Sequence, residues 1–378
     1  MGLGAFGFFG LFWGVFAVLL TDLSRALNLS PGPLGLALFV GAAASILAMA
    51  TLGWTADRLG RRAFLLLTGG VLGFGISGLA LADGYAALLA TLVVLYSSSG
   101  LYDVGINSAA VDLEQTTGRR FMALVHAAFS GGATVGAVAT GVLVEAGADY
   151  RLVYLGLLVP LGVLLVAFAA TRFPAGRRGA SGDGAGRPRL FRHLPLMLIG
   201  GVAMLGLGSE GEMEHWSGIY LRDTLGLPAL LGGSGVAVFY AAMAAGRLGT
   251  AAVVRLFGNR RTLVGAGLLT AAGMALSLAT REPALVVAGF LVVGLALSAV
   301  APIAFSVAGD VAPGGTGAAV SVVTTLGYGG FLMGPVIVGG LAELFGLRAA
   351  LSTIAFAGVT IALLGHRVSA DGRPKPAG

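Results

Sequence analysis

The sequence predicts an all-α membrane protein with twelve transmembrane helices in two pseudo-symmetric six-helix bundles. Three observations predict this fold class: the composition, the spacing of the apolar segments and an internal repeat. Of the 378 residues, 57% are hydrophobic and only 11% are charged, and the mean hydropathy is +0.92. Soluble domains carry about 25% charged residues, whereas a helix that crosses lipid needs about 20 mostly apolar residues.

Gly, Pro and clusters of charged residues divide the apolar sequence into twelve segments long enough to span a bilayer. We expect helices because a membrane barrel would require short strands of alternating polarity. Most of the 64 Gly residues fall inside these segments, where small side chains allow helices to pack closely. The predicted spans are 3–24, 33–56, 63–82, 85–112, 121–145, 150–171, 195–221, 228–253, 262–280, 284–308, 317–342 and 347–366.

The longest polar segment, residues 173–194, is rich in Gly, Arg and Pro and predicts a flexible cytoplasmic linker. Contact with anionic lipid heads is one interpretation of its arginines, but we favour a tether that carries orienting charges. The predicted organisation is an N-terminal bundle at 1–172, this linker, a C-terminal bundle at 195–368 and a cytoplasmic tail at 369–378.

The basic residues predict the orientation of the chain. If the N-terminus is cytoplasmic, 18 of the 23 Lys and Arg residues lie on the cytoplasmic side. Cytoplasmic loops of membrane proteins carry such an excess, so both termini are expected in the cytoplasm. The basic residues that fall on the other side are Arg25, Arg151, Arg222, Arg281 and Arg348.

The two halves of the sequence match at one constant offset of 198 residues. Parallel repeats of this kind imply a pseudo-twofold axis along the membrane normal, a central cavity between the halves and alternating access by rocking. The matching residues are Gly60, Arg62, Gly69, Ser108, Ala110 and Asp112 with Gly258, Arg260, Gly267, Ser306, Ala308 and Asp310, and Gly131, Gly136, Gly141 and Glu145 with Gly329, Gly334, Gly339 and Glu343.

The loop after the second span reads Gly53-Trp-Thr-Ala-Asp57-Arg58-Leu-Gly60-Arg61-Arg62. This segment resembles the signature loop of the major facilitator superfamily, and a degenerate copy runs from Arg255 to Arg261. The resemblance covers nearly the whole chain. It implies the major facilitator fold and a transporter that functions as a monomer.

Three further segments resemble the fucose-permease-like bacterial branch of this superfamily, whose members are sugar–proton symporters. This resemblance implies a sugar-like solute and a bacterial inner membrane. Glu212, Glu214 and His215 depart from the pattern of that branch. The Gly-Pro signature of drug–proton antiporters is absent from the fifth span, although Gly334-Pro335 occurs on the eleventh. The three segments are Asp103-Val-Gly-Ile-Asn107, His126-Ala-Ala-Phe-Ser130-Gly131 and Glu210-Gly-Glu-Met-Glu-His-Trp216-Ser217 with Tyr220-Leu221.

Asp103 lies near the middle of the predicted fourth span, where a charge costs about 2.5–3.5 kcal/mol on insertion scales. Desolvation favours the protonated form of a carboxyl group. We therefore predict that Asp103 binds and releases the coupling proton. The alternative is a buried acid that hydrogen-bonds to a neighbouring helix and serves packing only.

Glu210, Glu214 and Ser217 follow one another at helical spacing on the predicted seventh span, so they share one face. Two acids on one face suit proton binding, or hydrogen bonding of a hydroxyl-rich or cationic solute. Trp216 and Tyr220 suit stacking on a sugar ring, but they equally fit the aromatic belt at the outer membrane surface.

Two weaker proton-site predictions are Asp22, near Arg25 at the outer end of the first span, and His126, one to two turns inside the fifth. Asp22 equally fits a simple pair with Arg25, and His126 a neutral hydrogen-bonding residue. Arg247 either snorkels to the cytoplasm or pairs with an intramembrane acid. The predicted proton-coupling residues are Asp103, Glu210, Asp22 and His126, and the predicted substrate-cavity residues are Asn107, Glu214, Trp216, Ser217, Tyr220 and Tyr328.

The signature loop and its copy predict a cytoplasmic gate. The resemblance implies that Asp57 meets the N-terminus of the eleventh span, where the helix dipole favours an anion. In the second half Arg255 stands at the equivalent position, and we expect Asp112 or Glu114 to neutralise it. These pairs are expected in the outward-open state; orienting surface charges are the simpler alternative. The remaining predicted gate residues are Gly53, Arg58, Gly60, Arg61, Arg62, Arg260 and Asp310, with Asp310 pairing with Arg58 or Arg61.

The composition disfavours several other functions. Without Cys, neither a disulfide nor a thiolate metal site is possible, and the four His are too scattered for a metal cluster. Lys375 is the only Lys, so there is no P-loop for ATP. Transport is therefore expected to be secondary, driven by a proton gradient and without a cofactor. The +6 charge lies mostly in loops, which disfavours nucleic acid as a partner.

The leading prediction is a secondary active transporter, not an enzyme, that moves a small polar solute by proton symport. Its expected partners are that solute, protons and membrane lipid. An exporter of drugs or metabolites is the alternative within transport. A non-transporting receptor or an intramembrane enzyme on a transporter scaffold is the alternative of another class, but the sequence offers no convergent nucleophile, base and oxyanion groups.

Overall fold

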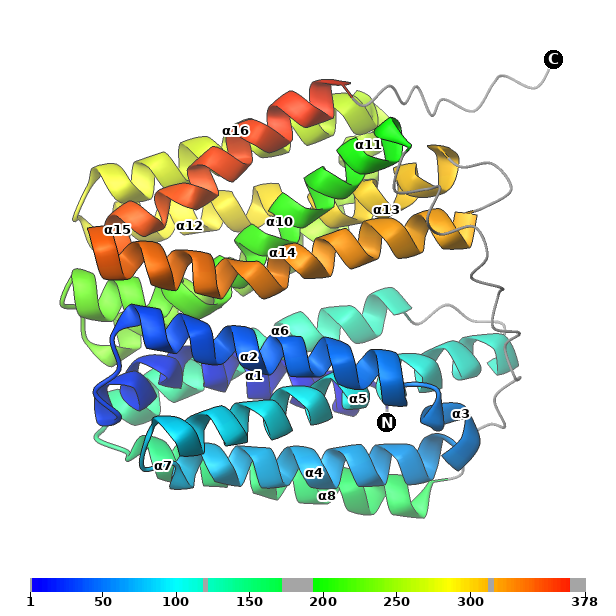
Figure 1. Ribbon diagram of the computed structural model, residues 1–378, viewed down its shortest axis with the longest axis vertical. Coiled ribbons are helices and arrows are strands. Elements are labelled where there is room, and N and C mark those ends of the chain that lie inside the picture. The colour runs from blue at the N-terminus through cyan, green and yellow to red at the C-terminus, as the bar shows by residue number, and fades with distance from the viewer. Residues whose placement is uncertain (1, 118–121, 172–192, 312–315, 368–378) are drawn as a thin grey trace. The chain divides into compact units, whose positions relative to one another are not determined.

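A computed structural model describes residues 2–117, 122–171, 193–311 and 316–367 (Figure 1). The fold is 91% helix, and the described part of the chain contains no β-strand. Among the described residues, eleven helical segments are long and apolar enough to cross a membrane. This confirms the predicted fold class. The count is one below the predicted twelve because two of the predicted spans fall in one segment, Ala229–Ala279, whose two helical arms meet at the non-helical residue Gly258.

The helices of the first half are α1 (Gly2–Ala26), α2 (Pro31–Leu52), α3 (Thr55–Leu59), α4 (Arg61–Leu81), α5 (Tyr85–Thr117), α6 (Met122–Glu145), α7 (Tyr150–Gly156) and α8 (Leu158–Ala170). Those of the second half are α10 (Leu194–Ile219) with a π-helical turn (Tyr220–Thr224), α11 (Ala229–Ala279), α12 (Pro283–Leu297), α13 (Val300–Val311), α14 (Thr316–Phe345), α15 (Leu347–Ala350) and α16 (Ser352–Arg367).

The chain divides into two compact units. Unit 1 comprises Met1–Ala180 and Gly226–Ala237, and unit 2 comprises Ser181–Leu225 and Val238–Gly378. The start of α11 thus groups with unit 1, whereas the sequence predicted one boundary within the linker. The linker at 173–194 and the tail at 369–378 fall almost entirely outside the described residues, so their predicted roles are not tested.

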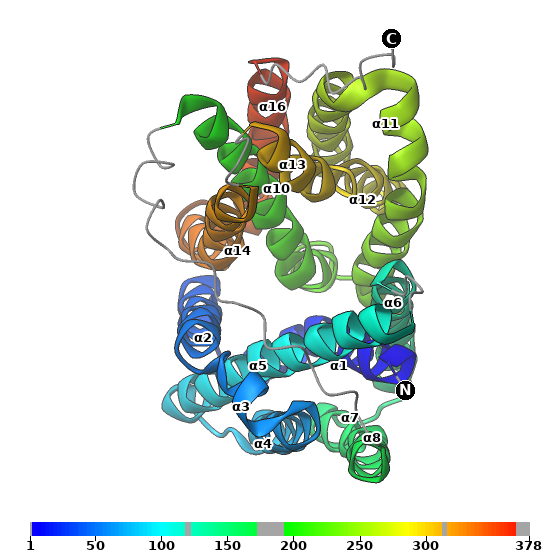
Figure 2. The same ribbon diagram turned by 90° about the vertical axis from the view of Figure 1, so that its right-hand side faces the viewer.

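In unit 1, α1 packs along α6, and α5 packs between α2 and α4 (Figure 2). Glycines make the first of these contacts possible. A Cβ atom added at Gly10 of α1 or at Gly132 of α6 would overlap a main-chain carbonyl group of the other helix. The two backbones therefore touch directly, as small residues allow in membranes, where close packing replaces the hydrophobic effect as the driving force.

In unit 2, α10 and α14 make the same kind of backbone contact at glycines. A Cβ atom at Gly330 of α14 would overlap the Met204 carbonyl group, and one at Gly208 of α10 would lie 3.2 Å from the Gly330 carbonyl oxygen. Gly208 and Gly330 lie 198 residues after Gly10 and Gly132. The helix crossings of the two units therefore follow the same offset as the sequence repeat.

The turns follow the repeat as well. Six described residues have positive φ, and they form three pairs separated by 198, 198 and 199 residues. Only Gly adopts this region without steric cost, although Asn tolerates it. The pairs are Asn28 (51°) with Gly226 (71°), Gly60 (77°) with Gly258 (76°), and Gly147 (87°) with Gly346 (80°).

The most informative pair is Gly60 and Gly258. Gly60 separates α3 from α4, as the predicted loop requires. Gly258 has nearly the same dihedral angles but lies inside the 51-residue helix α11, which bends there. The predicted break between residues 253 and 262 is therefore present at Gly258, and the two arms of α11 correspond to the two predicted spans.

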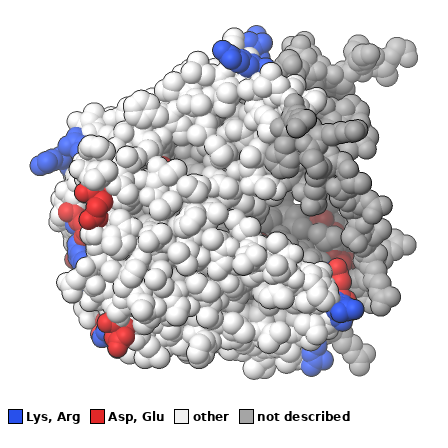
Figure 3. All heavy atoms as spheres, viewed as in Figure 1, with Lys and Arg blue, Asp and Glu red and all other residues white. Residues whose placement is uncertain are grey.

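Charged side chains lie at the ends of the helices. On the face shown in Figure 3, Lys, Arg, Asp and Glu lie mainly toward the left and right edges, with one basic patch at the top, and most of the surface between them is uncharged. Large apolar side chains such as Leu81, Leu248 and Leu256 are each more than 70% exposed. An uncharged, apolar flank of this kind suits contact with lipid.

Candidate functional site

The strongest concentration of ionisable groups inside a span lies on α10. Glu210, Glu212, Glu214 and His215 fall within six consecutive positions of this otherwise apolar and Gly-rich helix. Glu is a good helix former, so the helix itself is not disturbed. Burying these carboxyl groups within a span is energetically costly, so each requires a partner, a cavity or a proton.

Glu210 and Glu214 both face α11. Nη2 of Arg247 donates to Oε1 of Glu210 at 2.9 Å, and the Tyr240 hydroxyl donates to the Glu214 carboxylate. The two acids lie one turn apart on α10, so the face predicted from their spacing is present. The structure also decides between the two interpretations of Arg247, which pairs with an intramembrane acid.

Glu212 points to the other side of α10, toward α14 and α16. Oγ1 of Thr353 donates to its Oε2 at 3.0 Å, and the side chain is only 7% exposed. A Cβ atom at Gly334 would lie 3.1 Å from Cγ of Glu212, so the glycine provides room for the acidic side chain. Of the three carboxyl groups, only that of Glu210 has a cationic partner among the described residues.

The next turn of α10 is buried. Nδ1 of His215 lies 2.6 Å from the Gly211 carbonyl oxygen, and Tyr220 packs against Phe290 with ring centroids 6.4 Å apart. Trp216 and Ser217 are fully buried, and within the described residues Nε1 of Trp216 and Oγ of Ser217 have no hydrogen-bond partner. Stacking of these aromatic side chains on a solute stays a prediction.

In unit 1, Asp103 and Asn107 form a polar pair on α5. Nδ2 of Asn107 donates to Oδ1 of Asp103 at 2.8 Å and to its main-chain oxygen at 2.9 Å. Asn107 is the only hydrogen-bond partner of the Asp103 carboxylate among the residues that the structure describes. Within the described residues no cation pairs with this acid, and its role in binding protons stays a prediction.

The other predicted site residues occupy less distinctive places. Asp22 is half-buried near the C-terminal end of α1. His126 is exposed on α6, with its ring edge-on to Phe6 at a centroid distance of 5.3 Å. Tyr328 is 46% exposed on α14. Their roles in proton coupling or in the cavity stay predictions.

The signature loop forms an ion-pair network within unit 1. Arg61, at the start of α4, donates from Nη1 to Asp57 Oδ1 and from Nε to Asp112 Oδ2, both at 2.7 Å. Asp57 is exposed, whereas Arg61 and Asp112 are nearly buried. Arg61 thus ties α3 and α5 to α4. The sequence did not predict the pair of Arg61 with Asp112.

Other gate residues have local partners. The Arg58 guanidinium lies 4.9 Å from the Trp54 ring centroid, and Oε1 of Glu114 accepts from the main-chain nitrogen of Met122 at 2.8 Å. In unit 2, Nη2 of Arg260 bonds to the His366 ring. Arg62 and Arg255 are exposed, Gly53 ends α2 and Gly60 ends α3. The side chain of Asp310 lies outside the described residues, and pairing of Asp112 or Glu114 with Arg255 stays a prediction.

A family model described as Major Facilitator Superfamily matches residues 2–255 and, in a second match, residues 218–378. The chain belongs to the Major Facilitator Superfamily. An uncharacterized MFS-type transporter of Yersinia pestis is 31% identical to it over 365 residues, covering 97% of this chain and 94% of that relative. The predicted superfamily is thus confirmed, and the chain is a multi-pass membrane transporter.

Solved structures of the superfamily share its fold. A variant of the nucleoside transporter NupG aligns with a TM-score of 0.85 at 13% identity, covering 98% of this chain and 99% of the other. A D-xylose–proton symporter aligns with a TM-score of 0.74 at 14% identity, covering 96% and 95%. At these identities the likeness concerns the fold.

Sequence reasoning missed two residues of this superfamily member's polar site, Tyr240 and Thr353. Each is a single hydroxyl-bearing residue in an apolar span, and no spacing signal relates it to α10. Only the packing of α11 and α16 against α10 reveals that each donates to a carboxylate. In the part of the chain that the structure describes, no three His, Asp or Glu side chains come close enough together to hold a metal ion.

Proposed function

We propose that this superfamily member is a proton-coupled symporter of the fucose-permease-like branch that moves a small polar solute, sugar-like or a related metabolite. The observation that carries the proposal is the acidic face of α10, where Glu210 pairs with Arg247 and Glu214 accepts from Tyr240. Polar groups inside a span are costly and mark solute or ion pathways.

The arrangement supports coupling in a simple way. A proton that binds Glu210 removes its negative charge and weakens the pair with Arg247, because a charge-assisted hydrogen bond is about twice as strong as a neutral one. The freed guanidinium and the neighbouring polar groups are then donors for solute hydroxyl groups. Release of the proton restores the pair. Glu210 and the solute therefore compete for the Arg247 guanidinium, and the protonation of Glu210 decides which of them it binds.

Asp103 supplies a second proposed proton site, in unit 1. Its carboxyl group has one amide partner and no cationic one among the described residues, so a proton is the simplest means of neutralising it within the span. Two named relatives in fold, a nucleoside transporter and a D-xylose–proton symporter, support a hydroxyl-bearing solute and proton coupling.

The topology proposed with this function follows from the arginines. Both termini lie in the cytoplasm, the chain resides in a bacterial inner membrane, and the monomer is the functional unit. Excess basic residues on one side of the spans support this orientation. Alternating access, in which the gate pairs break as the inside opens, completes the proposed cycle.

Uptake into proteoliposomes tests the proposal. Purified protein is reconstituted and screened with labelled sugars and nucleosides, with an inward proton gradient, with an outward gradient and with none. Accumulation only under the inward gradient is the expected result. Accumulation under the outward gradient would identify an exporter, and a lack of gradient dependence for every transported solute would overturn proton coupling.

One variant tests the proposed proton site in unit 1, and a second variant is its control. Asp103→Asn is expected to abolish proton-driven accumulation while solute exchange across the membrane continues. The Glu282→Gln variant changes an acid outside the spans, at the N-terminal boundary of α12, and is expected to behave like the parent protein. If Asp103→Asn accumulates solute normally, Asp103 serves packing and the assignment is wrong.

A further inference from the structure

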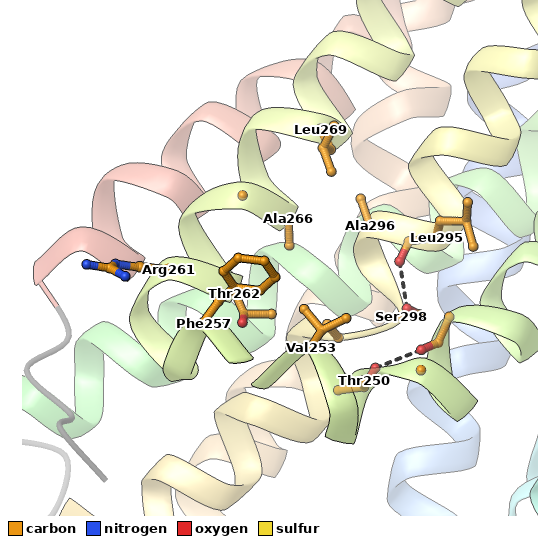
Figure 4. A pocket seen from close by; sticks show the side chains of 14 residues that line it. Thr250, Val253, Phe257, Arg261, Thr262, Ala266, Leu269, Leu295, Ala296 and Ser298 are labelled. Atoms are coloured by element: carbon orange, nitrogen blue, oxygen red, sulfur yellow. Dashed lines mark hydrogen bonds between the residues drawn. The ribbon is translucent and has the colours of Figure 1, made fainter. Parts of the chain in front are cut away.

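Unit 2 carries a groove whose lining includes none of the acidic residues of α10. It has a volume of about 470 Å³ and lies between the two arms of α11 and the junction of α12 with α13 (Figure 4). Most of its lining is Gly, Ala, Val, Leu and Phe. The polar residues of the lining are Thr250, Arg261, Thr262 and Ser298.

The hydroxyl groups of the groove are already satisfied by their own helices. Thr250 donates to the Gly246 carbonyl oxygen at 2.9 Å and Ser298 to that of Leu295 at 2.6 Å (Figure 4). Thr262 donates to the Gly258 carbonyl oxygen at 2.8 Å. With their donors used internally, these side chains present a largely apolar wall, and the occupant that fits it is a hydrocarbon chain.

The length of the groove matches one half of a membrane. Along the first arm of α11 the lining runs from Gly246 to Phe257, which corresponds to about 16 Å at 1.5 Å per residue. The hydrocarbon core of a bilayer is about 30 Å thick, so the groove spans about one leaflet. Phe257 and Leu269, at its rim, are more than half exposed.

Positive charge marks one end of this groove. Arg261 belongs to the lining, and its guanidinium points away from the apolar walls (Figure 4). Arg255 and Arg260 flank the same kink at Gly258 and are exposed. None of the three arginines pairs with a carboxylate within the described residues. Basic sites beside cytoplasmic helix ends bind anionic lipid headgroups.

The repeat shows how the groove arises. At the positions equivalent to Thr262 and Gly265, unit 1 carries Phe64 and Leu67, and Phe64 is buried. Unit 2 therefore has smaller side chains where unit 1 has large ones. A Cβ atom added at Gly265 would meet nothing within 4 Å, so the space is open.

We propose that this groove holds an acyl chain of an anionic phospholipid whose phosphate is bound by Arg261. The apolar wall, about one leaflet long, fits the acyl chain of such a lipid, and the basic end fits its phosphate. The two lie in the same order along the membrane normal as in a bilayer lipid. The linker of this chain is itself rich in arginine and the tail carries Arg373 and Lys375, so the arginines at the kink disfavour both as occupants.

Native mass spectrometry of the full-length protein in detergent tests this. The probes are phosphatidylglycerol, phosphatidylcholine and diacylglycerol with identical chains, and glycerol phosphate without chains. The parent protein is expected to retain one phosphatidylglycerol about fivefold more tightly than phosphatidylcholine, which is the increment for one arginine near a headgroup. Arg261→Gln is expected to erase that preference, and Gly265→Leu to weaken phosphatidylglycerol binding about tenfold by filling the groove.

Two matched variants control for general effects. Arg281→Gln removes an exposed arginine in the connection between α11 and α12, and Gly162→Leu adds a side chain on α8, where a Cβ atom meets nothing within 4 Å. Both are expected to bind phosphatidylglycerol as the parent does. The proposal is overturned if diacylglycerol or glycerol phosphate binds as tightly as phosphatidylglycerol, if the controls lose as much as the test variants, or if both Arg261→Gln and Gly265→Leu bind unchanged.

Discussion

Helices α1 and α10 occupy equivalent places in the two units but present different chemistry. Each crosses a partner helix through backbone contacts at glycines 198 residues apart. Where α10 carries Glu210 and Glu214, α1 carries Phe12 and Phe16. The Trp13 ring lies beside both phenylalanines, with centroid distances of 5.1 and 5.5 Å.

This difference separates what the repeat preserves from what it does not. The glycine crossings and the turns depend on backbone geometry, and they recur almost residue for residue. The side chains that face away from the crossing are free of that constraint, and only in α10 are they acidic. Unit 1 supplies its carboxylate from another helix, through Asp103 of α5. The proposed coupling chemistry is therefore distributed unequally over two similar scaffolds.

The largest expected effect tests the shared scaffold. Gly330→Ala and Gly132→Ala each place a methyl group against a main-chain carbonyl group, which is expected to cost about 3 kcal/mol or more because backbone must move. The measurement is the yield and thermal unfolding temperature of the solubilised protein. Gly329→Ala and Gly131→Ala, where a Cβ atom meets nothing, are the controls. Equal losses in variants and controls would refute the crossing as the cause.

The next effect tests the ion pair of α10. Glu210→Gln leaves Arg247 without its carboxylate, and loss of a charge-assisted hydrogen bond of about 1.5–3 kcal/mol predicts a roughly 10- to 100-fold fall in proton-driven uptake. Glu210→Gln combined with Arg247→Gln is expected to recover thermal stability but not transport. Recovery of transport in the double variant would show that the pair is only structural.

A smaller effect distinguishes the two faces of α10. Glu214→Gln changes the face toward α11 and is expected to lower uptake about fivefold, the equivalent of about 1 kcal/mol for one hydrogen bond. Glu212→Gln changes the face toward α14 and α16 and is expected to leave uptake within about twofold while Thr353 still donates to the side chain. The measurement is proton-driven uptake by both variants at one solute concentration. A larger loss of uptake in Glu212→Gln than in Glu214→Gln would place the site on the face toward α14 and α16.

The smallest effect concerns the loop network of unit 1. Asp112→Asn removes one of the two carboxylates on Arg61, but Asp57 still pairs with the guanidinium. We therefore expect a stability loss of about 1–3 kcal/mol, as for one hydrogen bond to a charged group. The thermal unfolding temperature of this variant is compared with that of Asp57→Asn. A larger loss of stability in Asp57→Asn, the exposed partner, than in Asp112→Asn, the buried one, would contradict the geometry.

The sequence predicted most of the fold because each span is a self-contained apolar segment, and its length is set by the bilayer. It also placed the break near Gly258 correctly, because Gly there adopts the positive φ that interrupts the helix. The shared face of Glu210 and Glu214 followed from helical spacing alone.

The partners of these residues could not be predicted in the same way. Tyr240, Thr353 and the Arg61–Asp112 pair join helices far apart in the sequence, so they depend on which helix faces which. Arg247 had two interpretations of equal standing because its depth and orientation are properties of packing. Relations between residues of one helix could be predicted from the sequence, whereas the contacts between different helices could not.

The positive-φ residues have a consequence for synthesis. Asn28, Gly60 and Gly147 all precede the linker, and their counterparts all follow it. A ribosome that has synthesised only the first half has thus already delivered one member of each of the three pairs. We expect the first six spans to enter the membrane and form these turns before the seventh span is translated.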